Sequence, residues 1–225
     1  MALTDSIDIY CERLAPDFWA EPVNALTNAA FLVAALAAVL MAPETSRRDP
    51  VALGFAVLTG IIGLGSFAFH TLATRGALLL DVLPITLFIH LYFFVALREM
   101  IGFRALGAGV VTALFFAGGL GVDRIGGGAL NGSVGYLPAL AALLAIGVAA
   151  RLAGTEAARR EDAARTLFAT ACVFALSLTF RSVDHAACAA FPPGTHFLWH
   201  MLNATVLFLL VRLLFAVRQH RPRPS

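Results

Sequence analysis

Residues 51–72 read VALGFAVLTGIIGLGSFAFHTL, and no Asp, Glu, Lys or Arg interrupts them. A run of this length can cross the hydrocarbon core of a bilayer as a helix, which needs about 20 apolar residues. The whole chain shares this bias, because 60% of its 225 residues are hydrophobic and only 13% are charged. Soluble domains are typically about half apolar and a quarter charged. The sequence therefore predicts an integral membrane protein.

Six further apolar runs of similar length flank this one, and short connections separate most of them. Spanning segments of this kind are helices, because lipid offers no partner to an open backbone polar group. We therefore expect an all-α, polytopic membrane protein with seven transmembrane helices. An acidic segment, residues 1–21, precedes the membrane domain of residues 22–218, and a basic tail, residues 219–225, follows it. The expected spans are Pro22–Met41, Val51–Leu72, Ala77–Leu97, Ala105–Val122, Val134–Leu152, Thr166–Val183 and Gly194–Val217.

The arginines divide unevenly between the two sides of this topology. All sixteen basic residues are arginine, a bias typical of GC-rich bacterial genomes. Arg13, Arg75 and Arg124 lie on the side of the amino terminus, whereas twelve lie on the opposite side. Since cytoplasmic loops are enriched in basic residues, we expect the amino terminus outside and the carboxyl terminus in the cytoplasm of a bacterial inner membrane. The net charge of +2, without a basic stripe, argues against a nucleic-acid partner. The twelve are Arg47, Arg48, Arg98, Arg104, Arg151, Arg159, Arg160, Arg165, Arg212, Arg218, Arg221 and Arg223.

Polar and ionisable side chains in the spans gather near one level. Such residues are costly in lipid and usually face the interior of the protein. In the expected topology, residues of four spans lie near the outer face, and only His90 lies clearly deeper. These residues are Ser66, His70, Asp81, Arg181, Asp184, His185, His196 and His200.

The histidine spacing within this group favours a metal ion. His196 and His200 are four residues apart, so they share one helix face and can bind one ion. With His70 they form a three-histidine set with an open fourth position, which is typical of catalytic zinc. Asp81 could accept a proton from a water there, and Ser66 could hydrogen-bond that water or an oxyanion. Alternatively, the histidines form a hydrogen-bonded pair and Ser66 only packs between helices.

The sequence resembles the alkaline ceramidases, within the membrane-hydrolase superfamily that includes the adiponectin and progestin receptors. The matching blocks occur in the order seen in that family and span nearly the whole chain. They are Tyr10-Cys11-Glu12 with residues 18–28 (FWAEPVNALTN), residues 65–70 (GSFAFH) with Asp81-Val82-Leu83-Pro84, and residues 196–200 (HFLWH).

The resemblance implies a zinc-dependent amidase that hydrolyses ceramide to a sphingoid base and a fatty acid. His70, His196 and His200 would hold the zinc. Asp81 would act as the general base and Ser66 would stabilise the oxyanion. The lipid substrate would keep its acyl chain between the helices.

The resemblance also implies a calcium site and a disulfide. Asp8, Glu12 and Glu21 are the candidate calcium ligands, although the same acids could form a solvated cap. The implied disulfide joins Cys11 to Cys188, and both fall on the side expected to be oxidising.

Three residues near the end of the sixth span have two interpretations. Arg181, Asp184 and His185 either pair with one another or with the amino-terminal acids, or they orient a zinc ligand. Rival functions are a zinc-binding receptor or sensor with little turnover, a hydrolase of another N-acyl lipid, and a carrier whose histidines bind haem or nothing.

Overall fold

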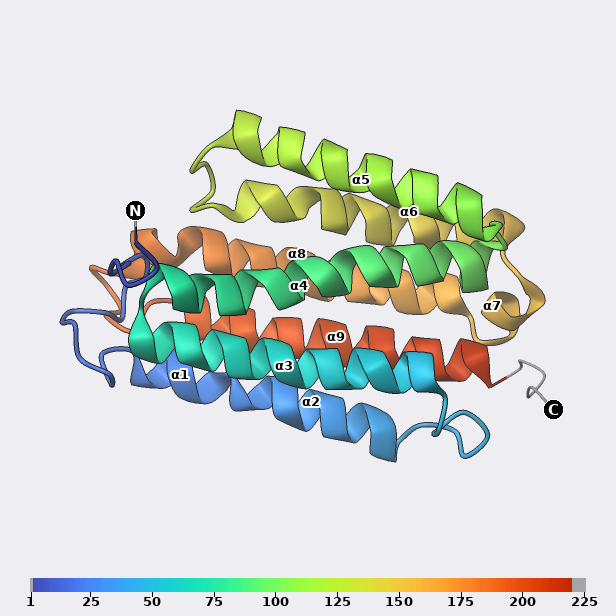
Figure 1. Cartoon of the computed structure of the whole chain (residues 1–225), viewed down its shortest axis with the longest axis horizontal. Helices are drawn as coiled ribbons and strands as arrows, with labels where there is room; N and C mark the ends of the chain where they lie inside the picture. The colour runs from blue at the N-terminus through green and yellow to red at the C-terminus, as the bar shows by residue number, and fades with distance from the viewer. Residues whose placement is uncertain (1, 220–225) are drawn as a thin grey trace.

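The computed structural model describes residues 2–219, which form a bundle of helices that run roughly along one axis (Figure 1). Seven stretches are long and apolar enough to cross a membrane, as the sequence predicts. The elements are α1 (Pro22–Thr27), α2 (Ala29–Leu40), α3 (Pro50–Leu72), α4 (Arg75–Ala96), the π-helical turn η1 (Leu97–Ile101), α5 (Ala105–Gly126), the 3-10 turn η2 (Ser133–Tyr136), α6 (Leu137–Ala153), α7 (Glu156–Arg160), α8 (Ala163–Ala187) and α9 (His196–Arg218).

Several boundaries differ from those expected from the sequence. The first span is divided into α1 and α2 at Asn28, whose amide donates to the carbonyl of Asn24. The third span begins earlier because the hydroxyl of Thr74 caps α4 by accepting from the backbone N–H of Ala77. The fourth span continues to Gly126, and the connection after α6 contains the short helix α7. Apolar runs thus located the spans, whereas local caps set their ends.

The helices pack into one core around α9. α3 lies along α4, α8 lies along α9 and α6, and α2 covers both α3 and α9. The buried face of α9 includes Val211, Leu214 and Phe215. By contrast, α5 lies at the edge of the bundle, and Ala108 is its one buried residue (Figure 1). Large apolar side chains that remain exposed on the spans, such as Leu114, suit a lipid environment.

The N-terminal segment, residues 2–21, lies across one end of the bundle, which we call the site end (Figure 1). It is fastened to the junction of α3 and α4 by backbone hydrogen bonds. The N–H of Ile7 donates to the carbonyl of Ala73 at 2.7 Å, and the N–H of Gly76 donates to the carbonyl of Leu3 at 2.8 Å. This attachment brings the N-terminal segment over the polar ends of α3 and α9.

At the opposite end, a buried arginine ties α9 to two other spans. The guanidinium of Arg218 contacts the carboxylate of Asp49 at 2.6 Å and that of Glu99 at 2.8 Å. Asp49 also caps α3, since its side chain accepts from the N–H groups of Val51 and Ala52. One carboxylate therefore both starts α3 and joins it to the end of α9.

Candidate metal centre

The structure brings the three predicted histidines together at the site end. His70 lies in the last turn of α3, and His196 and His200 lie in the first turns of α9. All three are buried, and the centroids of their rings are 4.6 to 5.2 Å apart. One nitrogen from each ring lies within 4.8 Å of the other two. Residues far apart in the chain thus form one compact cluster of possible metal ligands.

Hydrogen bonds fix the orientation of two of these rings. Nδ1 of His70 lies 2.6 Å from Oε2 of Glu21, and Nδ1 of His200 lies 3.0 Å from the hydroxyl of Thr27. Because that hydroxyl donates to backbone carbonyls, it accepts from Nδ1–H of His200. Nδ1 therefore carries the proton in both rings, and Nε2 carries the lone pair that a metal needs.

The remaining ring nitrogens have the character of metal ligands. Nε2 of His70, Nε2 of His200 and Nδ1 of His196 are buried without a hydrogen-bond partner. Leaving a buried polar atom unpaired costs about 1–3 kcal/mol, so three such atoms in one place require an explanation. A divalent cation bound between the rings would satisfy all three, and the donor set fits zinc.

Glu21 supports this cluster from the N-terminal segment. Its side chain is buried and accepts from Nε of Arg13 at 2.6 Å and from the amide of Asn24 at 3.2 Å, besides contacting His70. Burial alone would raise the pKa of Glu21, but the hydrogen bonds from His70 and Arg13 outweigh it and lower the pKa. Glu21 is therefore a carboxylate that orients the imidazole of a candidate metal ligand, a role that its acidity alone did not predict.

Of the three acids expected to bind calcium, two accept hydrogen bonds from other groups of the protein and one is exposed. Both carboxylate oxygens of Glu12 accept backbone N–H groups, from Val23 at 2.7 Å and from Asn24 at 2.8 Å. Burial raises the pKa of Glu12, although these two bonds act in the opposite direction. Asp8 is exposed, and the clusters of possible ligands among residues 2–219 include none of these acids. Asp8, Glu12 and Glu21 thus do not form one group of possible side-chain ligands among the described residues, and the calcium site stays a prediction.

Ser66 on α3 and Asp81 on α4 lie beside the histidine cluster. Ser66 is buried one turn before His70, and its side chain lies near the Asp81 carboxyl. Oδ1 of that carboxyl is buried without a partner and is free to accept a proton or a hydrogen bond. Gly65 permits this approach, because a Cβ there would collide with the backbone carbonyl of Leu80.

The disulfide implied by the resemblance is present and holds the N-terminal segment against α8. Cys11 is bonded to Cys188, with their Cα atoms 5.3 Å apart. Next to it, the buried carboxylate of Asp184 accepts from the N–H of Cys11 at 3.1 Å and from the N–H of His196 at 3.0 Å. Gly194 has a φ of +67°, and a Cβ there would collide with Asp184. Asp184 therefore anchors both the segment and the start of α9.

Arg181 and His185, which are close to Asp184 in the sequence, have different surroundings from that residue. Arg181 donates to the carbonyl of Asn131 at 2.7 Å and to the hydroxyl of Ser133 at 3.0 Å. His185 is exposed beside Cys11 and Cys188. Of the three residues expected to pair or to orient a ligand, only Asp184 hydrogen-bonds directly to a candidate metal ligand.

Tyr10 closes the metal centre from the N-terminal segment. Its ring stacks on that of His196, with centroids 3.6 Å apart and planes inclined by 21°. Tyr10 is itself buried and packs on Phe69. Sequence reasoning missed this contact, as it missed the contacts of Arg13 and Thr27, because no spacing rule relates a loop to a distant helix.

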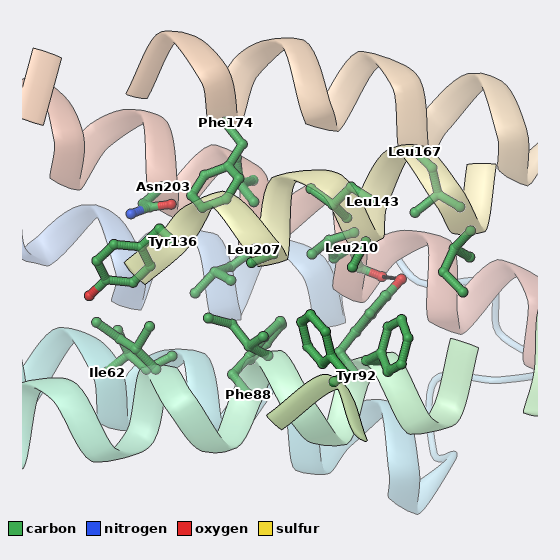
Figure 2. Close-up of a pocket in the computed structure, with 18 of the residues that line it drawn as sticks. Ile62, Phe88, Tyr92, Tyr136, Leu143, Leu167, Phe174, Asn203, Leu207 and Leu210 are labelled. Atoms are coloured by element: carbon green, nitrogen blue, oxygen red, sulfur yellow. Dashed lines mark hydrogen bonds between the residues drawn. The ribbon is translucent and has the colours of Figure 1, made fainter. Parts of the chain in front are cut away.

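An apolar cavity lies along α9, next to the histidine cluster in the sequence of that helix. Figure 2 shows Tyr136 and Asn203 at one end and Leu210 and Tyr92 toward the other. On α9 its wall begins at Trp199, which precedes His200, and continues to Leu210, about 16 Å further at 1.5 Å per residue. Nearly all of its lining side chains are aliphatic or aromatic.

Comparison with known proteins agrees with these features. A family model described as Ceramidase matches residues 4–224, which is almost the full length of the chain. No curated protein matches the chain. The matched region contains the histidine cluster, Ser66 and Asp81.

Proposed function

The chain belongs to the ceramidase family, and from this premise we propose that it is a zinc-dependent lipid amidase. Its substrate would be ceramide or a closely related N-acyl lipid. The observation that carries the proposal is the juxtaposition of three buried, partnerless imidazole nitrogens with the partnerless carboxylate oxygen of Asp81. Metal ligands and a nearby proton acceptor are the elements that metal-assisted hydrolysis requires.

His70, His196 and His200 would hold the zinc, which leaves a fourth position for water or substrate. When bound, the zinc would polarise the amide carbonyl and lower the pKa of a water molecule toward about 7. The three rings are packed so closely that the cluster suits a single ion rather than haem, which needs ligands on opposite faces of a flat macrocycle.

Asp81 would perform the proton transfers. It accepts a proton from the attacking water through its carboxylate and then delivers a proton to the amide nitrogen as the C–N bond breaks. Ser66 lies beside Asp81, and once Asp81 has taken the proton from the water, the single hydroxyl proton of Ser66 can be donated to an oxyanion on the carbonyl carbon. One water is consumed, and the products are a carboxylate and a protonated amine.

The apolar cavity would hold the acyl chain. Its length of about 16 Å along α9 is close to half of the ~30 Å hydrocarbon core, which is the depth that one leaflet provides. The cavity begins beside His200, so a chain lying in it would place its amide carbonyl near the metal centre. The arginine distribution supports an extracytoplasmic site end in a bacterial inner membrane.

The proposal is tested with purified protein, elemental analysis and a fluorescent ceramide assay. Asp81→Asn is expected to retain zinc but to lose at least ~100-fold in turnover, since it removes only the proton acceptor. Asp17→Asn is the matched control, because Asp17 is an exposed acid in the N-terminal segment. A chelator should abolish wild-type turnover. Zinc binding without cleavage by wild-type protein would instead support a receptor or sensor.

A further inference from the structure

Arg181 is a cation inside a membrane span, and no acid of the described residues contacts it directly. Cations in such positions are costly and usually pair with an acid. Yet no carboxylate oxygen of the described residues lies within 4.0 Å of its guanidinium. Its direct contacts are with neutral groups, namely a carbonyl, a hydroxyl and two aromatic rings, whereas Asp81 interacts with it only at longer range. The charge of Arg181 is therefore not neutralised by an ion pair with any described residue.

Arg181 lies where the metal centre meets the apolar cavity. The guanidinium lies 5.6 Å from the ring centroid of Trp199, which lies in α9 between His196 and His200. It also lies 5.4 Å from the ring centroid of Tyr136. Both rings line the cavity, and Figure 2 shows Tyr136 at its end. Arg181 thus lies beside the cavity at the level of the histidine cluster.

The guanidinium retains hydrogen-bonding capacity for a ligand. Arginine has five N–H donors in a planar fork. The bonds to Asn131 and Ser133 both use Nη1, and neither uses Nε or Nη2. The remaining donors match the two oxygens of a carboxylate, which arginine binds more strongly than it binds neutral acceptors.

We propose that the guanidinium of Arg181 forms a carboxylate-binding subsite between the metal centre and the cavity. The inference rests on the proposed function, because amide hydrolysis creates a carboxylate at the end of the acyl chain. A second source is a carboxylate already present on the amine half, as in an N-acyl amino acid. In the first case the subsite retains the fatty-acid product, and in the second it selects an anionic substrate.

Binding can be measured without turnover, so failure of the proposed hydrolysis would not affect this test. The chain has two tryptophans, and Trp19→Phe leaves Trp199, beside Arg181, as the fluorescent reporter. In this background, Arg181→Gln is expected to weaken dodecanoate binding at least ~10-fold while dodecanol binding changes less than about twofold. Arg124→Gln, an exposed arginine of α5, is the control. Equal weakening of both ligands would indicate a structural role and overturn the proposal.

Arg181→Lys is a second variant, which tests the proposal even if Arg181→Gln does not fold. It keeps the charge but not the planar fork, so its affinity for dodecanoate should lie between those of wild-type protein and Arg181→Gln. If Arg181→Gln does not fold and Arg181→Lys binds both ligands with unchanged affinity, the assignment of a bidentate site is overturned.

Activity assays separate the two sources of the carboxylate. If it belongs to the product, Arg181→Gln should raise the inhibition constant of dodecanoate at least ~10-fold with neutral ceramide as substrate. If it belongs to the amine half, Arg181→Gln should lower kcat/KM at least ~10-fold for N-dodecanoylglycine relative to ceramide. If a folded, zinc-loaded Arg181→Gln protein shows neither change, the proposal is overturned.

Discussion

Replacing Glu21 with glutamine should weaken zinc binding without removing any metal ligand. The wild-type carboxylate accepts from Nδ1 of His70 at 2.6 Å and thereby holds Nε2 toward the cluster. Glutamine keeps the size of the side chain but is neutral, so the charge-assisted bond to the imidazole is lost. Partners of this kind typically contribute 10–100-fold to metal affinity, which corresponds to about 1.4–2.8 kcal/mol.

The same substitution disturbs a second buried charge. Arg13 is 6% exposed and donates to Glu21 at 2.6 Å, so Glu21→Gln leaves its guanidinium without a counter-charge. Breaking a buried pair from one side costs about 3–5 kcal/mol, whereas replacing both partners is often nearly neutral. The double variant Arg13→Met with Glu21→Gln should therefore recover much of the lost thermal stability. It should not recover zinc affinity, because His70 still lacks its carboxylate.

Equilibrium competition with a chelator gives the zinc affinity, and thermal unfolding in detergent gives the stability. Asp17→Asn is the control, because Asp17 is an exposed acid in the N-terminal segment with no proposed role in metal binding. Two results would refute the reasoning. One is a folded Glu21→Gln protein whose zinc affinity lies within about threefold of wild type. The other is a double variant that regains full zinc affinity together with its stability.

Three further predictions concern stability. Gly65→Ala should lower the unfolding free energy by about 1–3 kcal/mol, because its Cβ meets the Leu80 carbonyl. Gly60→Ala is the control and should be tolerated, because its Cβ would lie 3.7 Å from a leucine methyl. Equal shifts of the thermal unfolding temperature in the two variants would contradict this prediction. Asp49→Ala should destabilise the protein more than Asp49→Asn, by about 1 kcal/mol from the N-cap alone, and matching denaturation curves would count against the capping role. Because the pKa of Glu21 is lowered, the stability difference between wild type and Glu21→Gln should be full above pH 4.5 and shrink as the pH falls further; a difference that grows on acidification would reverse this sign.

The spans and the histidine cluster could be predicted because they follow from constraints that act over the whole chain. Lipid requires about 20 apolar residues for each crossing, so the seven spans are visible as composition alone. The ends of the spans then fix a common level, which places His70 near the two histidines of α9. Their spacing of four residues puts His196 and His200 on one helix face, as the structure has them.

The N-terminal segment could not be predicted in the same way. Glu12 and Glu21 are acids in an acidic stretch, and their count suggested a cation site. Their partners depend on how the segment crosses the bundle, which brings Glu21 to a histidine 49 residues later in the chain. The stacking of Tyr10 on His196 depends on the same path. Periodicity describes helices but gives no register for a loop.

The division of ligands between α3 and α9 also constrains how the protein matures. Because His196 and His200 lie in the first turns of α9, a nascent chain has a single imidazole of the trio until synthesis reaches the start of its seventh crossing. If the trio binds zinc as proposed, the ion would be captured late in biogenesis, after the other six crossings have been synthesised. A translation product that stalls before His196 would have the cavity walls of α3 and α4 but only one of the three proposed ligands. Zinc loading would then indicate that synthesis has passed His200.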